Sequence, residues 1–135
     1  MTGVCLRLLL VEDEALIAMM AEDLIEALGH RVVLTVATLG EGQMACAGHD
    51  FDAALLDVNL NGESSMALAA ALKSRGCPFA FTTGYGAGGI ESAHADKPVL
   101  TKPYALAELE AVLAGFVAQL AGVSSITSSV DSKRG

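Results

Sequence analysis

The feature that most limits how this chain can fold is an alternation of short apolar runs with stretches of helical periodicity, from residue 6 to residue 120. Short continuous apolar runs are typical of strands that are buried on both faces of a parallel sheet. The segments between them repeat apolar residues every three or four positions, as a helix with one buried face does. This order predicts an α/β fold with a five-stranded parallel sheet and helices on both of its faces.

The boundaries of the predicted elements follow from these patterns and from the glycines that interrupt them. Gly40 and Gly42 lower the helix propensity of the second helix, which we therefore predict to be weak. Residues 58–65 are read as a flexible polar loop after the third strand. The expected strands are 6–11, 31–37, 53–56, 78–82 and 98–101, and the expected helices are 14–28, 39–48, 64–76 and 106–120.

Some apolar and histidine side chains are assigned to the structure of the chain and not to its chemistry. The first helix is predicted to bury the face that carries Leu16, Met20, Leu24 and Leu28, which recur every four residues, with Ile17 and Ile25 alongside. The methionines are read as core filler and not as an interaction surface. The histidines have no ligand spacing, so we expect them at surface or turn positions. These methionines are Met19, Met20, Met44 and Met66, and the histidines are His30, His49 and His94.

Composition and charge exclude several classes of function. The 135 residues are 53% hydrophobic and 18% charged, which suits one folded domain over residues 1–120, with a loose tail over 121–135. The net charge of −8 and the scattered cations argue against a nucleic-acid-binding surface. The uncharged stretch 111–130 contains Gln, Ser and Thr and is not read as a membrane span. Three widely spaced cysteines without a CxxC pair favour a reducing, cytoplasmic location.

Chemically active side chains stand just after four of the five predicted strands. Glu12 and Asp13 follow the first strand, Asp57 the third, Thr83 the fourth and Lys102 the fifth. The carboxyl ends of parallel strands lie at one edge of a sheet, where ligands bind in folds of this class. The second strand contributes no such residue, which suits an outer position in the sheet.

Three carboxylates at one sheet edge repel one another and raise each other's pKa unless a cation lies among them. Mg²⁺ suits such a group because it binds one or two carboxylates, keeps several water ligands and accepts phosphate oxygens. An aspartate beside the metal can attack a phosphoryl group, while a lysine ammonium offsets the charge of that group. The pattern therefore indicates Mg²⁺-dependent transfer of a phosphoryl group to an aspartate.

The motifs "LLLVEDE", "ALLDVNLNG", "FTTGYG" and "LTKPY" resemble, in order and spacing, those of bacterial response-regulator receiver domains. The resemblance runs from residue 6 to about residue 120. It implies a stand-alone, CheY-like receiver with the doubly wound, flavodoxin-like (βα)5 fold and strand order 2-1-3-4-5.

By position, the resemblance also implies a metal set. Asp57 corresponds to the phospho-acceptor, which also contacts the metal, and Asp13 corresponds to a direct Mg²⁺ ligand. Glu12 corresponds to an acid that acts on the metal through water. The backbone carbonyl of Asn59 completes the set.

Two further motif residues correspond to groups that contact the phosphoryl group. Thr83 corresponds to the switch hydroxyl that moves toward it, and Lys102 to the lysine that pairs with its oxygens. In this family the lysine precedes a cis proline, here Pro103.

The chain departs from the family pattern in the region of its switch. Val99 stands where many receivers carry a switch Tyr or Phe, and Tyr85 is the nearest aromatic that could substitute in part. Residues 84–96 form a short, glycine-rich connection, so we expect a fourth helix that is short, mobile or ordered only on activation. The form "PFAFTTGYG", together with a small residue at the switch position, resembles a subgroup of stand-alone receivers that are often paired with HWE-type histidine kinases.

The resemblance implies a single-domain response regulator of a two-component phosphorelay, and not an enzyme with turnover. Its partner would be a sensor histidine kinase or a phosphotransfer protein, and the signal would leave through protein contact because no output domain is expected. Slow self-dephosphorylation and a monomer or weak homodimer are also expected.

Two other classes of protein agree less well with the same residues. A pseudo-receiver that binds partners without phosphorylation typically lacks the acid pair, the acceptor or the lysine, and all of them are present here. A small Mg²⁺-dependent phosphohydrolase needs a second acid two residues after its nucleophile, whereas position 59 is Asn.

Overall fold

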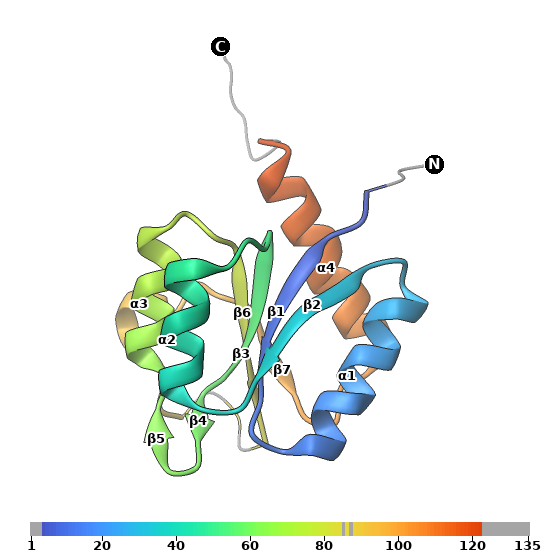
Figure 1. Cartoon of the computed structure of the whole chain (residues 1–135). Coiled ribbons are helices and arrows are strands. Elements are labelled where there is room, and N and C mark those ends of the chain that lie inside the picture. Colours follow the sequence, from blue (N-terminus) through green and yellow to red (C-terminus); the bar gives the residue numbers. More distant parts are fainter. Residues whose placement is uncertain (1–3, 85, 87, 123–135) are drawn as a thin grey trace.

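The structure, a computed structural model, describes residues 4–84, 86 and 88–122 (Figure 1). Its centre is one parallel sheet in the order β2-β1-β3-β6-β7. Counted along the chain, these five strands stand in the order 2-1-3-4-5, so the predicted fold class is confirmed. The strands are β1 (Arg7–Val11), β2 (Arg31–Val36), β3 (Ala53–Asp57), β6 (Phe79–Thr83) and β7 (Val99–Thr101).

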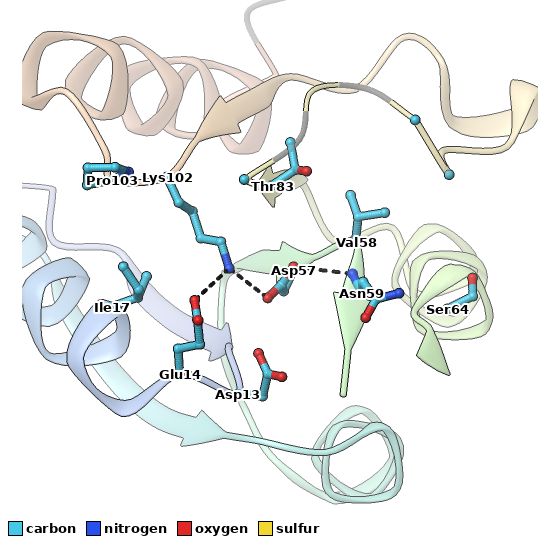
Figure 2. Close-up of a pocket in the computed structure, with 13 residues that line it drawn as sticks. Asp13, Glu14, Ile17, Asp57, Val58, Asn59, Ser64, Thr83, Lys102 and Pro103 are labelled. Atoms are coloured by element: carbon cyan, nitrogen blue, oxygen red, sulfur yellow. Dashed lines mark hydrogen bonds and ion pairs between the residues drawn. The ribbon is translucent and has the colours of Figure 1, made fainter. Parts of the chain in front are cut away.

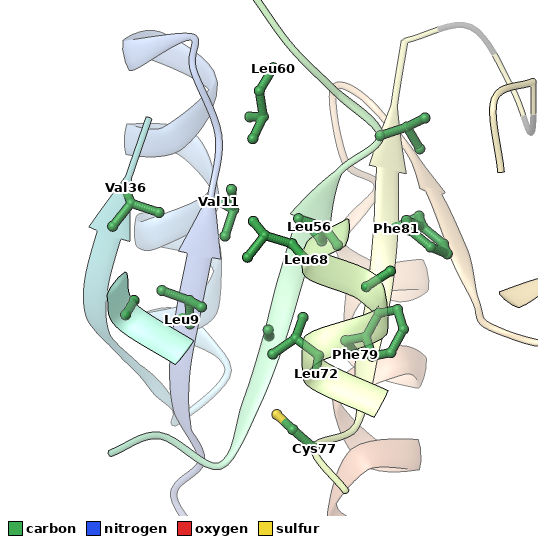
Figure 3. Close-up of a cluster of buried hydrophobic side chains, with 14 of the residues drawn as sticks. Leu9, Val11, Val36, Leu56, Leu60, Leu68, Leu72, Cys77, Phe79 and Phe81 are labelled. Carbon is green, nitrogen blue, oxygen red and sulfur yellow. The ribbon is translucent and has the colours of Figure 1, made fainter. Parts of the chain in front are cut away.

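Four helices cover the two faces of this sheet. The first, α1 (Ala15–Ala27), shares one face with α4 (Leu106–Leu120), and α2 (Leu39–Gly48) shares the other with α3 (Met66–Ser74) (Figure 1). Because side chains alternate along a strand, each strand feeds both layers of the core. Figure 3 shows the layer under α3, where side chains of β1, β3 and β6 meet those of the helix.

The buried face of α1 differs in part from the prediction. Ile25 is buried, and Ile17, Leu24 and Leu28 pack against the core, as predicted. Leu16 is 75% exposed and Met20 44%, whereas Ala18 and Ala21, which were not predicted, are buried. A four-residue repeat rotates by about 40° at each step of an α-helix, so it does not stay on one face. The small alanines instead let the helix lie close to the sheet. Reading the methionines as core filler is likewise wrong for three of the four: Met19, Met20 and Met44 are exposed, and Met66 is buried.

The predicted flexible loop after β3 is a short antiparallel hairpin. Its strands are β4 (Asn59–Leu60) and β5 (Glu63–Ser64). The two residues between them, Asn61 and Gly62, have φ angles of +52° and +87°. Two successive positive φ angles are the mark of a tight hairpin turn, and Asn-Gly is its preferred dipeptide.

The connection from β6 to β7 contains a single 3-10 turn, η1 (Ser92–His94), in the part of the chain that the structure describes. His94 lies in this turn, in line with the expected surface or turn position, but its side chain is buried and only 4% exposed. Its ring lies edge-on to Phe79 and Phe81, with centroid distances of 6.0 and 6.2 Å. A turn of three residues covers this part of the sheet with few side chains, and the imidazole fills the space over the two phenylalanines.

Part of the chain lies outside these descriptions. Tyr85 and residues 123–135, most of the predicted tail, are not among the described residues. Within the described residues, no helix combines the length and the apolar content needed to cross a membrane.

We expect Gly42→Ala to destabilise the protein and Gly40→Ala to stabilise it slightly. A Cβ on Gly42 would lie 2.5 Å from Cδ1 of Leu68, which is fully buried, whereas a Cβ on Gly40 would meet no neighbour within 4 Å. Overpacking costs about 1–3 kcal/mol, and replacing a helical glycine gains about 0.5–1 kcal/mol. Urea denaturation of both variants measures the difference. Equal stabilisation by both would contradict the close contact between α2 and α3.

Candidate functional site

The predicted site residues converge at the carboxyl edge of the sheet (Figure 2). Parallel pairing sets the ends of neighbouring strands level, with Val11 beside Leu56 and Asp57 beside Thr82. Three parts of the chain therefore meet, although they are up to 90 residues apart. They are the first acids after β1, the last residue of β3 and the first residue after β7. A cavity of about 620 Å³ lies beside them, and its lining includes Asp13, Asp57 and Lys102.

Three carboxylates form a compact cluster at this edge. Glu12, Asp13 and Asp57 each offer one oxygen, and these atoms lie within 4.8 Å of one another. Glu12 and Asp57 are buried, and Asp13 is half-buried. Burial raises the pKa of the Glu12 carboxyl to about 7, and the charge of Asp57 adds to this rise. A positive charge close to these acids would therefore stabilise their ionised forms.

Lys102 supplies one positive charge to this cluster. Its Nζ lies 2.9 Å from Oδ2 of Asp57, 3.1 and 3.2 Å from the two carboxylate oxygens of Glu12, and 3.6 Å from Oε1 of Glu14. Burial acts to lower the pKa of Lys102, but its hydrogen bonds to Asp57 and Glu12 outweigh burial and raise it. The lysine therefore stays protonated. One ammonium among several carboxylates still leaves an excess of negative charge.

Backbone N–H groups of the β4–β5 hairpin bind two of the acids. The N–H of Asn59 donates to Oδ1 of Asp57 at 3.2 Å, and the N–H of Asn61 donates to Oδ2 of Asp13 at 2.9 Å. The side-chain oxygen of Asn59 accepts from the N–H of Gly62 at 2.8 Å and so closes the hairpin. The orientation of these acids thus depends on the hairpin as well as on the strands.

Thr83 ends β6 beside the acids and lines the same cavity. It is 4% exposed, and its carbonyl accepts a hydrogen bond of 2.8 Å from the N–H of Lys102. The peptide between Lys102 and Pro103 is cis, as the resemblance implied. Val99, at the position of the missing aromatic, lies on the edge strand β7 and is 39% exposed.

The structure brings together every residue that was predicted for the site, and it adds two that were missed. Glu14 contacts Lys102, and the backbone of Asn61 contacts Asp13. In the sequence, the acidic run at 12–14 could have indicated Glu14, and the Asn-Gly dipeptide at 61–62 could have indicated Asn61. Reading this dipeptide as a hairpin turn would have predicted that the loop is ordered.

The donor atoms fit a hard divalent cation. The cluster offers carboxylate oxygens and lacks the thiolate and imidazole groups that favour zinc, copper or iron. Asn59, whose backbone carbonyl is the fourth predicted ligand, lines the same cavity. In the part of the chain that the structure describes, Glu12, Asp13 and Asp57 form the one group of three or more acids, cysteines or histidines close enough to share a metal ion.

No protein-family model matches the chain, and no curated protein does. Solved structures do match. The solution structure of SdrG from Sphingomonas melonis Fr1 is 41% identical, with a TM-score of 0.76, over 87% of this chain and 99% of that one. The BeF3-activated conformation of SdrG, from Pseudomonas melonis Fr1, is 39% identical, with a TM-score of 0.72 and the same coverage. The REC domain of the Erythrobacter litoralis response regulator PhyR is 28% identical, with a TM-score of 0.73, over 93% of this chain and 97% of that one.

Proposed function

Because the chain belongs to the receiver domains of bacterial response regulators, we propose that it accepts a phosphoryl group on Asp57 in a Mg²⁺-dependent reaction. Its role is in response-regulator signalling, and the phosphoryl group is the signal that it receives. The proposed donor is a phosphohistidine of a sensor histidine kinase or a phosphotransfer protein in the cytoplasm. The proposed output is a change of its own protein-contact surface and not the turnover of a substrate.

The proposed reaction is an in-line transfer between two side chains. A carboxylate oxygen of Asp57 forms a bond to phosphorus, and the P–N bond of the phosphohistidine breaks. The electron pair of that bond stays on the imidazole nitrogen. Hydrogen bonds from Asn59 and Lys102 to the two oxygens of Asp57 hold the attacking carboxylate in a fixed orientation. Slow hydrolysis of the acyl phosphate by water would return the protein to its resting state.

The other site residues have supporting roles in this proposal. Mg²⁺ would be held by Asp13, Asp57 and the backbone carbonyl of Asn59, with Glu12 acting through water, and it would offset the charge of the phosphoryl oxygens. Lys102 would pair with one phosphoryl oxygen, and the hydroxyl of Thr83 would donate to another. Since Thr83 ends β6, a movement of its side chain toward the phosphoryl group would also shift the start of the connection that follows this strand.

The observation that carries the proposal is the single ammonium of Lys102 among the buried carboxylates of Glu12 and Asp57. A purely structural ion pair needs one carboxylate for each cation. The excess acids cost stability unless a further cation binds, and a site with one divalent cation and one lysine can then accept an anionic phosphoryl group.

Intact mass and amide NMR spectra, recorded with Mg²⁺ before and after addition of a small phosphoramidate or acyl-phosphate donor, test the proposal. We expect a gain of one phosphoryl group that EDTA prevents, and shifts that spread from Asp57 through Thr83 to residues 88–96. Beryllofluoride should produce the same shifts without the gain in mass. No gain, together with no Mg²⁺-dependent shift at Asp13 or Asp57, would leave a receiver fold that binds partners without phosphorylation.

A further inference from the structure

The turn of the β4–β5 hairpin reaches across the site to an acid that lies far away in the sequence. The N–H of Asn61 donates to Oδ2 of Asp13 at 2.9 Å, across 48 residues of chain. Among the described residues, this N–H is the hydrogen-bond donor that contacts the Asp13 carboxylate. Lys102 contacts Glu12 and Asp57 but makes no such contact with Asp13. The orientation of Asp13 therefore depends on the hairpin.

The hairpin is anchored on both sides of its turn. Leu60 is 1% exposed and belongs to the same buried cluster as Val11 (Figure 3). Both the N–H and the hydroxyl of Ser65 donate to the carbonyl of Val58, at 3.1 and 3.0 Å, which fixes the chain on either side of the hairpin. A buried anchor and closed hydrogen bonds restrict the movement of the turn. They hold the N–H of Asn61 at a constant position relative to β1 and β3.

The contact with Asp13 also depends on the backbone conformation at position 61. Asn61 has a φ of +52°, in the left-handed region that glycine and asparagine adopt most readily and β-branched residues avoid. The bond engages one carboxylate oxygen of Asp13, Oδ2, and so fixes the direction of the whole carboxylate, which belongs to the acid cluster that could hold a metal ion. Figure 2 shows the Asp13 carboxylate at the same cavity as Asp57 and Asn59.

We propose that the β4–β5 hairpin is a positioning element for the metal site, and that Asn61 sets the Mg²⁺ affinity by orienting Asp13 through its backbone N–H. This inference rests on the proposed Mg²⁺ site. Hydrogen bonds that orient a metal-binding side chain typically change metal affinity by about 10–100-fold. Because the donor is a backbone group, the side chain at position 61 acts through the φ angle that it permits.

A matched pair of substitutions at position 61 tests this inference. Asn61→Gly keeps the N–H and the positive φ, whereas Asn61→Val keeps the N–H and disfavours the positive φ. Mg²⁺ alone is titrated into the whole 135-residue chain, and the amide shifts near Asp57 are followed. We expect the affinity of Asn61→Gly to stay within about 3-fold of the wild type and that of Asn61→Val to fall about 10-fold or more.

Two further measurements separate positioning from general destabilisation. Urea denaturation in EDTA gives the stability of each metal-free variant, and Gly62→Ala disturbs the same turn at a residue with a φ of +87°. If Asn61→Val does not fold, Gly62→Ala takes its place and should also weaken Mg²⁺ binding. Equal affinities for the turn variants and Asn61→Gly would overturn the inference and leave the proposed function standing. A wild-type protein that binds no Mg²⁺ would instead overturn the metal site itself.

Discussion

Asp57→Asn is expected to abolish phosphorylation of the chain by a small phosphoryl donor. The amide is not a nucleophile toward phosphorus, and it also removes an anionic oxygen from the proposed metal set. The variant should still fold, because it lowers the number of like charges in a buried cluster whose acids lie within 4.8 Å of one another. Intact mass with Mg²⁺ and the donor measures the loss, and the amide spectrum reports the fold.

Asp50→Asn is the matched control for this prediction. Asp50 precedes β3, whereas Asp57 ends it, and its side chain is 83% exposed in an ion pair with Arg7. The same chemical change just before the start of this strand should leave phosphorylation as in the wild type. A gain of one phosphoryl group by Asp57→Asn would mean that another acid of the cluster is the acceptor.

Lys102→Met is expected to lower the free energy of unfolding of the metal-free protein by about 2–3 kcal/mol at pH 8. Removing one partner of a buried ion pair commonly costs about 3–5 kcal/mol. The cost should be smaller here because Glu12, whose pKa is already about 7, can take up a proton when its cation is lost. Urea denaturation in EDTA measures the change. Mg²⁺ should then stabilise the variant more than the wild type, because the lysine no longer shares the same carboxylates.

The control for this prediction is Lys73→Met. Lys73 is exposed on α3 and contacts the carbonyl of Ala93 at 3.4 Å, a weak interaction at the surface. Its replacement should change stability by about 0.5 kcal/mol or less. If Lys102→Met were as stable in EDTA as the wild type, the ammonium of Lys102 would not stabilise the buried carboxylates, and the prediction would be wrong.

The ends of the strands were the part of the site that could be predicted from the sequence. An apolar run that stops at a carboxylate marks both the strand and the point where it leaves the core, as at Val11 and Leu56. Because parallel strands end at one edge, the positions of Glu12, Asp57 and Lys102 in the sequence predicted their meeting in space. The structure brings these three side chains together through the hydrogen bonds of Lys102.

The helix faces and the connections were predicted less well. On α1, the predicted face is correct for Ile25 but wrong for Leu16, because small residues such as Ala21 pack against the sheet in its place. Between β6 and β7, no local pattern distinguishes His94 from a surface histidine. Its burial comes from its position over Phe79 and Phe81, which precede it by more than ten residues.

The sequence by itself determined the α/β class, the order of elements and the residues at the strand ends, because each of these depends on local periodicity and on the fixed direction of parallel strands. Only the tertiary structure decided how the acids are oriented. The bond from Asn61 to Asp13 and the contacts of Lys102 with Glu12 and Asp57 join segments 45 to 90 residues apart. Such contacts depend on distances and directions between elements, and these become fixed when the core packs.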